Sequence, residues 1–307
     1  MTASRALRVT LASTALAAIV VLLAACGGGA SRDGRVRVVA TTTVLADLVR
    51  QVGGDRVDVV SLVPKGGEVH TFDPTPSDVR QLVEADLVVR NGLGLDDWLA
   101  GLAKDAGTKA PIVALGEDLP GVAYLGGDPA QGAQVNPHLW LDVSYARRYA
   151  DRIAEHLIAA DPAHEADYRA GAARYGAELD ALDAETRTRM AAIPERNRTV
   201  ISFHDAFPYF AAAYGLTIDG TIVESPGQDP SASQVASLVR TIRTKDVRAI
   251  FTEVQFSDKL AQAIAGETDA VVVSNLYTDS LGDAPLDSYV AVMRANVDRV
   301  VEALAQP

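Results

Sequence analysis

Cysteine is almost absent from this chain: Cys26 is the only one among 307 residues. No disulfide can therefore form within the chain, and no cluster of thiolates can bind a soft metal ion. Aromatic residues are also few, at 6%, and the 28 basic residues are outnumbered by 40 acidic ones. The formal net charge of −12 argues against nucleic acid as a partner, because phosphate backbones are bound by basic surfaces. It suits a cationic ligand, which an acidic protein attracts over long range.

Long hydrophobic segments are limited to one, at residues 11–25, which carries no charge and follows Arg5 and Arg8. This segment is short for a helix that spans a bilayer, which needs about 20 residues. A basic start, a short apolar segment and small residues at its end are typical of a secretory signal peptide. We place the signal peptide at residues 1–25, with an uncleaved membrane anchor as the alternative.

The ending Leu23-Ala24-Ala25-Cys26 resembles the lipobox of bacterial lipoproteins. This resemblance implies that Cys26 carries a lipid and becomes the mature N-terminus. Residues 26–35, which are rich in glycine, would then form a flexible tether. Loss of residues 1–25 removes two arginines and no acidic residue, so the net charge changes from −12 to −14. We expect a lipid-anchored protein of the cell envelope, at the outer face of the cytoplasmic membrane or in the periplasm.

The remaining chain has the pattern of two α/β lobes, in keeping with a length that suggests about two domains. Short segments rich in β-branched residues alternate with helical patterns, which predicts mainly parallel sheets flanked by helices. The predicted strands are residues 36–42, 57–63, 86–90 and 111–115, then 199–203, 217–223, 247–252 and 270–274. We place the N-terminal lobe at residues 36–160 and the C-terminal lobe at residues 194–307.

Residues 161–193 predict one long helix between the lobes. Asp161-Pro162 is typical of a helix start, and the residues that follow are rich in Ala, Glu and Arg. Such a helix would span about 45 Å at 1.5 Å per residue. Because it has few large apolar residues, we interpret it as a rigid connector rather than a core helix. A break into two helices near Gly171 or Gly176 is the alternative.

Three of the five histidines lie where predicted strands end. His70 follows the second strand, His138 lies in the loop after the fourth, and His204 follows the first strand of the second lobe. Asp279 follows that lobe's last strand. Ligands of open parallel sheets bind beyond the carboxyl ends of strands, so these side chains would face a common cleft. Each could instead be a hydrogen-bonded loop residue, and the gaps of 68, 66 and 75 residues match no short metal motif.

Three imidazoles and one carboxylate suit a divalent transition metal, because such ligands reach Zn²⁺ at about 2.0–2.2 Å in tetrahedral geometry. Four protein ligands would close the site, whereas catalytic zinc usually keeps one position for water. The pattern therefore favours binding over catalysis. A zinc hydrolase with Glu68 or Glu253 as its base is the alternative, although the chain has no His-Glu-x-x-His segment. His156 and His164 lie on predicted helices, and we interpret them as surface residues.

The segments around these residues resemble the marker segments of one family, in order along nearly the whole mature chain. They are residues 66–74, 136–142 (Asn-Pro-His-Leu-Trp-Leu-Asp), 202–210, 251–256 and 277–281. The family is that of the cluster A-I (cluster 9) metal-binding lipoproteins, the solute-binding subunits of ABC importers for zinc or manganese. The resemblance implies two four-stranded parallel lobes joined by a long rigid helix, with a divalent metal in the cleft and an ABC permease as partner. It also implies that the metal ligands are His70, His138, His204 and Asp279.

Zinc is the metal that we favour. Manganese members of the family commonly have Glu at the third ligand position, which is His204 here, and nitrogen-rich ligation favours zinc. The zinc members often carry a long loop rich in histidine and acids before the second motif. Residues 117–135 occupy that place and contain no histidine, which leaves manganese as the alternative.

Several neighbours of the predicted ligands have other interpretations. Glu68 could replace the fourth ligand, but we favour an acceptor that orients the imidazole of His70 or a simple polar loop residue. For Glu253 we favour a structural hydrogen bond. Asp142 would cap a helix, while Trp140 and Phe203 would shield the site from water. We expect a monomer, and metal release by small lobe rotations or loop opening. A surface adhesin is a further alternative, for which the sequence shows no adhesive module.

Overall fold

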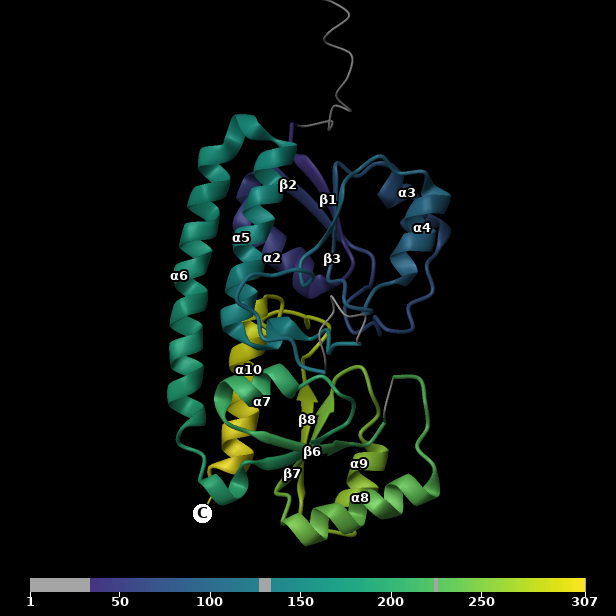
Figure 1. Ribbon diagram of the computed structural model, residues 1–307, viewed down its shortest axis with the longest axis vertical. Coiled ribbons are helices and arrows are strands. Elements are labelled where there is room, and N and C mark those ends of the chain that lie inside the picture. Colours follow the sequence, from purple (N-terminus) through teal and green to yellow (C-terminus); the bar gives the residue numbers. More distant parts are fainter. Residues whose placement is uncertain (1–33, 127–133, 224–225, 307) are drawn as a thin grey trace, which may run out of the picture. The chain divides into compact units, whose positions relative to one another are not determined.

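The computed structural model describes residues 34–126, 134–223 and 226–306 (Figure 1). The predicted signal peptide and Cys26 lie outside these residues, as does most of the tether predicted at residues 26–35. None of the helices in the three ranges combines the length and the apolar character that crossing a bilayer requires.

Two four-stranded sheets form the framework of the chain after Arg35, and all of their strand pairs are parallel, as the sequence predicts (Figure 1). The first sheet has the order β2-β1-β3-β4, and the second has the same plan, β6-β5-β7-β8. The strands are β1 (Val36–Ala40), β2 (Val57–Ser61), β3 (Leu87–Arg90), β4 (Ile112–Ala114), β5 (Thr199–Ser202), β6 (Thr217–Thr221), β7 (Ala249–Glu253) and β8 (Val271–Leu276). Each sheet therefore directs the carboxyl ends of its four strands to one edge.

Helices connect successive strands, as parallel pairing requires. They are α2 (Thr43–Gly53), α3 (Pro76–Val83), α4 (Trp98–Ala106), α5 (Val143–Ala160), α6 (Glu165–Met190), α7 (Pro208–Tyr214), α8 (Ala232–Lys245), α9 (Lys259–Ala265) and α10 (Tyr289–Leu304). Some of these helices start with a side-chain cap: Thr42 accepts from the amide of Leu45, and Ser231 forms a capping box with Gln234. Asp142 caps α5, as the sequence predicts.

The long helix α6 has 26 residues and runs without a break at Gly171 or Gly176. It contacts α2 and α5 beside the first sheet and α7 and α10 beside the second (Figure 1). A Cβ on Gly171 would lie 2.0 Å from the carbonyl oxygen of Val52 in α2, and one on Gly176 would lie 2.3 Å from Nε of Arg147. The glycines therefore permit close packing of helices rather than interrupt one.

One hydrophobic core continues from one sheet to the other. It includes Val38 of β1, Tyr175 and Leu179 of α6, and Phe251 of β7. The opposite face of each sheet has a smaller core of its own, under α3 and α4 in the first lobe and under α8 and α9 in the second. Because the lobes share a core, wide separation would expose much apolar surface, and the fold favours small relative movements.

Candidate metal centre

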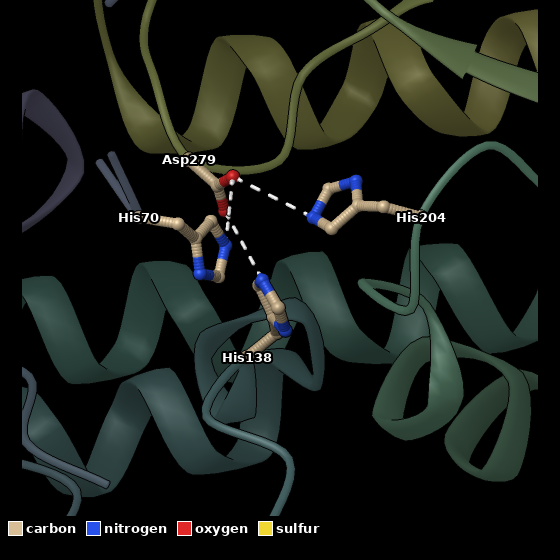
Figure 2. Close-up of side chains that lie close together, drawn as sticks. All are labelled: His70, His138, His204 and Asp279. Atoms are coloured by element: carbon tan, nitrogen blue, oxygen red, sulfur yellow. Dashed lines mark ion pairs between the residues drawn. The ribbon is translucent and has the colours of Figure 1, made fainter. Parts of the chain in front are cut away.

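Loops from both lobes bring His70, His138, His204 and Asp279 together, with their polar ends pointing toward one another (Figure 2). His70 lies in the loop after β2, and His138 directly precedes a short 3₁₀ turn, η3 (Leu139–Leu141). His204 follows β5, and Asp279 follows β8. One potential ligand atom from each of the four lies within 4.8 Å of all the others. The strand-end rule thus locates the place where these side chains meet.

The distances between these groups are close to those of a tetrahedral site. Oδ1 of Asp279 lies 3.5 Å from Nε2 of His138, and Oδ2 lies 3.8 Å from Nε2 of both His70 and His204. The three ring centroids are 5.3 to 5.6 Å apart. A tetrahedron with metal–ligand bonds of about 2.1 Å has edges of about 3.4 Å. A cation of this size therefore fits with only small adjustments of the side chains.

The polar atoms that face the centre are buried and lack hydrogen-bond partners. They are Nε2 of His70, His138 and His204, and Oδ1 of Asp279. The side chains of His138, His204 and Asp279 are at most 2% exposed, whereas that of His70 is 20% exposed. An unpaired buried polar group costs about 1–3 kcal/mol. A cation at the centre would satisfy all four atoms at once.

Burial and the neighbouring charges shift the pKa values of this cluster in opposite directions. Burial and His204 lower the pKa of His70 to about 4, and burial also lowers the pKa of His138. Burial is the largest single influence and lowers the pKa of His204, but the carboxylates of Glu253, Asp279 and Glu68 together outweigh it and raise the value to about 9. Burial raises the pKa of Asp279 to about 7. Two imidazoles are thus neutral at pH 7, while the third would have to release a proton before it could bind a metal.

Each of three predicted ligands has a polar neighbour that restricts its orientation. Nδ1 of His204 lies 3.0 Å from Oε1 of Glu253, which is itself 1% exposed. Nδ1 of His138 lies 3.0 Å from Oδ1 of Asn136. Nε2 of Gln255 donates to Oδ2 of Asp279 at 3.2 Å. In metal sites such neighbours fix the tautomer and direction of the ligand.

Other neighbours contribute to the loop and the walls of the centre. Oε1 of Glu68 accepts from the backbone amide of His70 at 2.8 Å, so Glu68 orders the loop rather than the imidazole. Trp140 packs on His138, with ring centroids 5.4 Å apart. Phe256 lies edge-on to His204 at 5.3 Å, and Phe203 stacks behind it. Phe256, rather than Phe203 as the sequence predicts, therefore shields the ring of His204 from water.

A cavity of about 580 Å³ leads to the three imidazoles. Its lining includes Thr71 and Leu93 of the first lobe and Asp205 and Pro208 of the second. All three imidazoles line the cavity, and His70 is the most exposed of the four predicted ligands. His156 and His164 lie outside the cluster.

The sequence alone predicts no role for three residues near the centre: Asn136, Gln255 and Phe256. Asn136 stands two residues before His138, a spacing at which an Asn side chain commonly bonds the backbone. That spacing is a usable signal for its contact with His138. Gln255 acts on a residue 24 positions away, and no local pattern indicates this pairing.

The structure combines two similar α/β lobes, a long helix packed along both, and a buried cluster of three histidines and one aspartate at their junction. These features define the class of metal-binding substrate-binding proteins of ABC importers. The sequence model of the ZnuA family, described as zinc-uptake complex component A, periplasmic, matches residues 38–303. The chain belongs to this family, which confirms the resemblance. The family consists of binding components of uptake systems, and the chain is not an enzyme.

Individual relatives match over nearly the whole chain. The manganese ABC transporter substrate-binding lipoprotein PsaA of Streptococcus anginosus is 30% identical, over 94% of this chain and 96% of its own. The iron ABC transporter substrate-binding lipoprotein MtsA of Streptococcus pyogenes serotype M1 is 31% identical with the same coverage. The periplasmic zinc-binding protein TroA of Treponema pallidum superposes with a TM-score of 0.81 at 28% identity, over 89% of this chain and 100% of its own.

Proposed function

We propose that this protein binds Zn²⁺ outside the cytoplasmic membrane and delivers it to an ABC permease for import. Its ligands would be Nε2 of His70, His138 and His204 together with the carboxylate of Asp279. The observation that carries this proposal is the convergence of four buried donor atoms, without hydrogen-bond partners at three nitrogens and one oxygen, within 4.8 Å. The family's role in zinc uptake supports the same function.

The choice of zinc rests on the donor set. Three nitrogens and one carboxylate favour zinc over the harder manganese ion, which prefers oxygen ligands. The relatives include proteins named for manganese and for iron, and a structural neighbour named for zinc. Manganese is therefore the second candidate for the cargo, at the same four residues.

The surrounding residues have defined tasks in binding. Glu253 lies against Nδ1 of His204 and leaves Nε2 of that ring directed at the centre. Binding would displace a proton from His204, whose pKa is raised to about 9, while His70 and His138 are already neutral at pH 7. The burial of three of the four ligands would hold the cargo away from water until the lobes or loops shift.

The anchor and the domain division belong to the same proposal. A signal peptide at residues 1–25 would direct export, and lipidation of Cys26 with a tether at residues 26–35 would hold the protein at the membrane. The lobes at residues 36–160 and 194–307, joined by residues 161–193, would present the cargo to the permease. We propose that the protein acts as a monomer.

The test is elemental analysis of protein purified without added metal, followed by competition between Zn²⁺ and Mn²⁺ in the presence of a chelator. We expect bound zinc near one equivalent and preference for Zn²⁺. Asp279→Ala should weaken Zn²⁺ binding by at least about 100-fold, since it removes a ligand and not merely a neighbour of one. His156→Ala, which removes an imidazole outside the cluster, is the matched control and should bind as the unchanged protein does.

Two results would contradict the proposal. Retention of zinc by Asp279→Ala with unchanged affinity would exclude this carboxylate as a ligand. Tighter binding of Mn²⁺ than of Zn²⁺ would transfer the proposal to the second candidate metal.

A further inference from the structure

The side chain of Asn136 bonds in two directions at the junction of the lobes. Its Oδ1 accepts from the backbone amide of His138 at 3.1 Å and lies 3.0 Å from Nδ1 of the same residue. Its Nδ2 donates to the backbone oxygen of Asp205 at 2.6 Å and to Oδ2 of Asp205 at 3.0 Å. Asp205 directly follows His204. One amide group therefore connects the loops of two proposed ligands, one from each lobe.

We propose that Asn136 is a positioning residue that both selects the tautomer of His138 and holds the His138 and His204 loops together. This inference rests on the function proposed above, because it concerns the same four ligands. It adds that metal retention depends on a residue that is not itself a ligand.

The orientation of the Asn136 amide follows from its backbone partners. The amide of His138 can only donate and the carbonyl of Asp205 can only accept, so Oδ1 must face His138 and Nδ2 must face Asp205. Oδ1 cannot donate, and the ring contact therefore requires a proton on Nδ1 of His138. The lone pair is left on Nε2, the atom that faces Asp279 at 3.5 Å.

The His138 loop is also fixed from the side of its own lobe. Nδ2 of Asn91 donates to the backbone oxygen of Pro137 at 3.0 Å, and Oδ1 of Asn91 accepts from the hydroxyl of Tyr149 at 2.7 Å. This anchor is largely buried and leaves the loop little freedom to follow the second lobe. A movement of the His204 loop away from the first lobe must then break the Asn136–Asp205 bonds.

A neighbouring contact supplies a matched comparison. The hydroxyl of Tyr209 donates to the backbone oxygen of Asn136 at 3.0 Å and accepts from the amide of Leu125 at 3.0 Å. It joins the same two lobes but does not touch the ring of His138. Tyr209→Phe therefore weakens the junction without changing the tautomer.

The experiment compares Asn136→Ala, Asn136→Asp and Tyr209→Phe with the unchanged protein. Four properties are measured: Zn²⁺ affinity, the rate of Zn²⁺ dissociation into excess chelator, the visible spectrum with Co²⁺, and the tautomer of His138 by ¹⁵N NMR without metal. Asn136→Asp keeps the acceptor for His138 but loses both donors to Asp205 and adds a charge beside that carboxylate. Asn136→Asp thus separates the effect on the His138 tautomer from the effect on the contact between the loops. It also keeps the inference testable if Asn136→Ala fails to fold.

We expect Asn136→Ala to bind Zn²⁺ about 10- to 100-fold more weakly, with a mixed tautomer at His138 and an altered Co²⁺ spectrum. Asn136→Asp should keep the tautomer but release Zn²⁺ about tenfold faster, because the bridge is lost. Tyr209→Phe should stay within about threefold of the unchanged protein in affinity and rate.

Two outcomes would overturn the inference. One is a proton on Nε2 rather than Nδ1 of His138 in the unchanged protein. The other is that both Asn136 variants bind and release Zn²⁺ with the same affinity and rate as the unchanged protein. If the unchanged protein binds neither Zn²⁺ nor Co²⁺, the proposed function fails, while the tautomer measurement without metal still tests the positioning of His138.

Discussion

Two of the regions in which the lobes meet differ in burial. In the first, which we call the spine junction, α2, α6 and α10 pack together beside residues 278–281. In the second, which we call the cleft junction, Asn136 meets Asp205 and Tyr209. In the cleft junction Asp205 is exposed, Asn136 is half-buried and only Tyr209 is buried, whereas most partners in the spine junction are buried. The lobes are therefore held together firmly at the spine junction and loosely at the cleft junction.

The spine junction fastens the Asp279 loop to the first lobe, although its strand belongs to the second sheet. Oγ of Ser280 accepts from the amide of Gly66 at 2.7 Å, four residues before His70. The amide of Leu281 donates to Oγ1 of Thr43 at 2.8 Å, and Nε1 of Trp140 donates to the backbone oxygen of Thr278 at 2.8 Å. Three of the four proposed ligands are thus held by one connected set of bonds.

The His204 loop is the exception, because its bonds to the first lobe are those of the cleft junction. We therefore expect release of the cargo to separate His204 from the other three ligands, rather than to divide the ligands in pairs. Substitutions in the spine junction should lower global stability, and changes at the cleft junction should act mainly on binding.

The largest effect should come from Gly171→Ala in the spine junction. The new Cβ would lie 2.0 Å from a backbone oxygen of α2, which cannot rotate away as a side chain can. We expect the free energy of unfolding in urea to fall by about 3 kcal/mol. Gly101→Ala in α4 is the matched control, since its Cβ would meet nothing within 4 Å. That control should raise stability by about 0.5–1 kcal/mol, because glycine disfavours a helix. A stable Gly171→Ala protein would show that α6 can move away from α2.

The second effect concerns the hydroxyl of Thr43 in the same region, which accepts from the amide of Leu281 and donates to Oγ of Ser280 at 3.5 Å. Thr43→Val keeps the shape of the side chain but leaves the amide of Leu281 without its acceptor in a buried place. We expect a loss of about 1–3 kcal/mol in the free energy of unfolding. Thr217→Val, at an exposed position of β6, should change it by less than about 0.5 kcal/mol. Equal stability of the two variants would contradict the firm attachment of the Asp279 loop.

These contrasts also show what the sequence predicts and what it does not. All eight strands are found within one or two residues of their predicted ends, because β-branched runs bounded by turn residues depend mainly on local preferences. Parallel topology places His70 and His138 beyond one sheet edge and His204 and Asp279 beyond another. The family resemblance, rather than the spacing of these residues, implies that the four side chains meet at one point.

Features that depend on contact between distant segments are not visible in the pattern. From the sequence alone, Gly171 cannot be distinguished from a glycine that breaks a helix. The close approach of the Val52 backbone explains why a glycine stands there. The partner of Asn136 is 69 residues away, in the other lobe. Glu68 bonds the amide of His70 instead of its ring, because the loop turns the carboxylate toward the backbone. Local preference fixes none of these contacts.

The third prediction concerns the cleft side, where Zn²⁺ affinity should depend on pH through His204 and Asp279. The pKa of His204 is raised to about 9, so binding displaces a proton below pH 9, and affinity should fall about tenfold for each pH unit lost. Below pH 7 the carboxyl of Asp279, with its pKa raised to about 7, must also lose a proton, which steepens the fall. Burial lowers the pKa of His70 to about 4, so this ring adds no dependence above pH 4.

Chelator competition between pH 6 and 9.5, with proton release measured in weak buffer, checks this prediction. About one proton per Zn²⁺ should be released at pH 8. Glu253→Gln removes the largest of the charges that raise the pKa of His204 and should move the dependence to lower pH. An affinity that stays constant between pH 7 and 9 would show that His204 is neutral before binding.

The smallest effect should come from Tyr209→Phe at the cleft junction. This change removes two hydrogen bonds between the lobes and leaves the packing of the ring in place. Because water can reach the half-buried segment around Asn136, the freed groups can be solvated, and the free energy of unfolding should fall by only about 0.5–1 kcal/mol. Urea unfolding measures this change beside Thr43→Val. If Tyr209→Phe proved the more damaging of the two, the cleft junction would be the firm attachment, and His204 could not be the ligand that separates first.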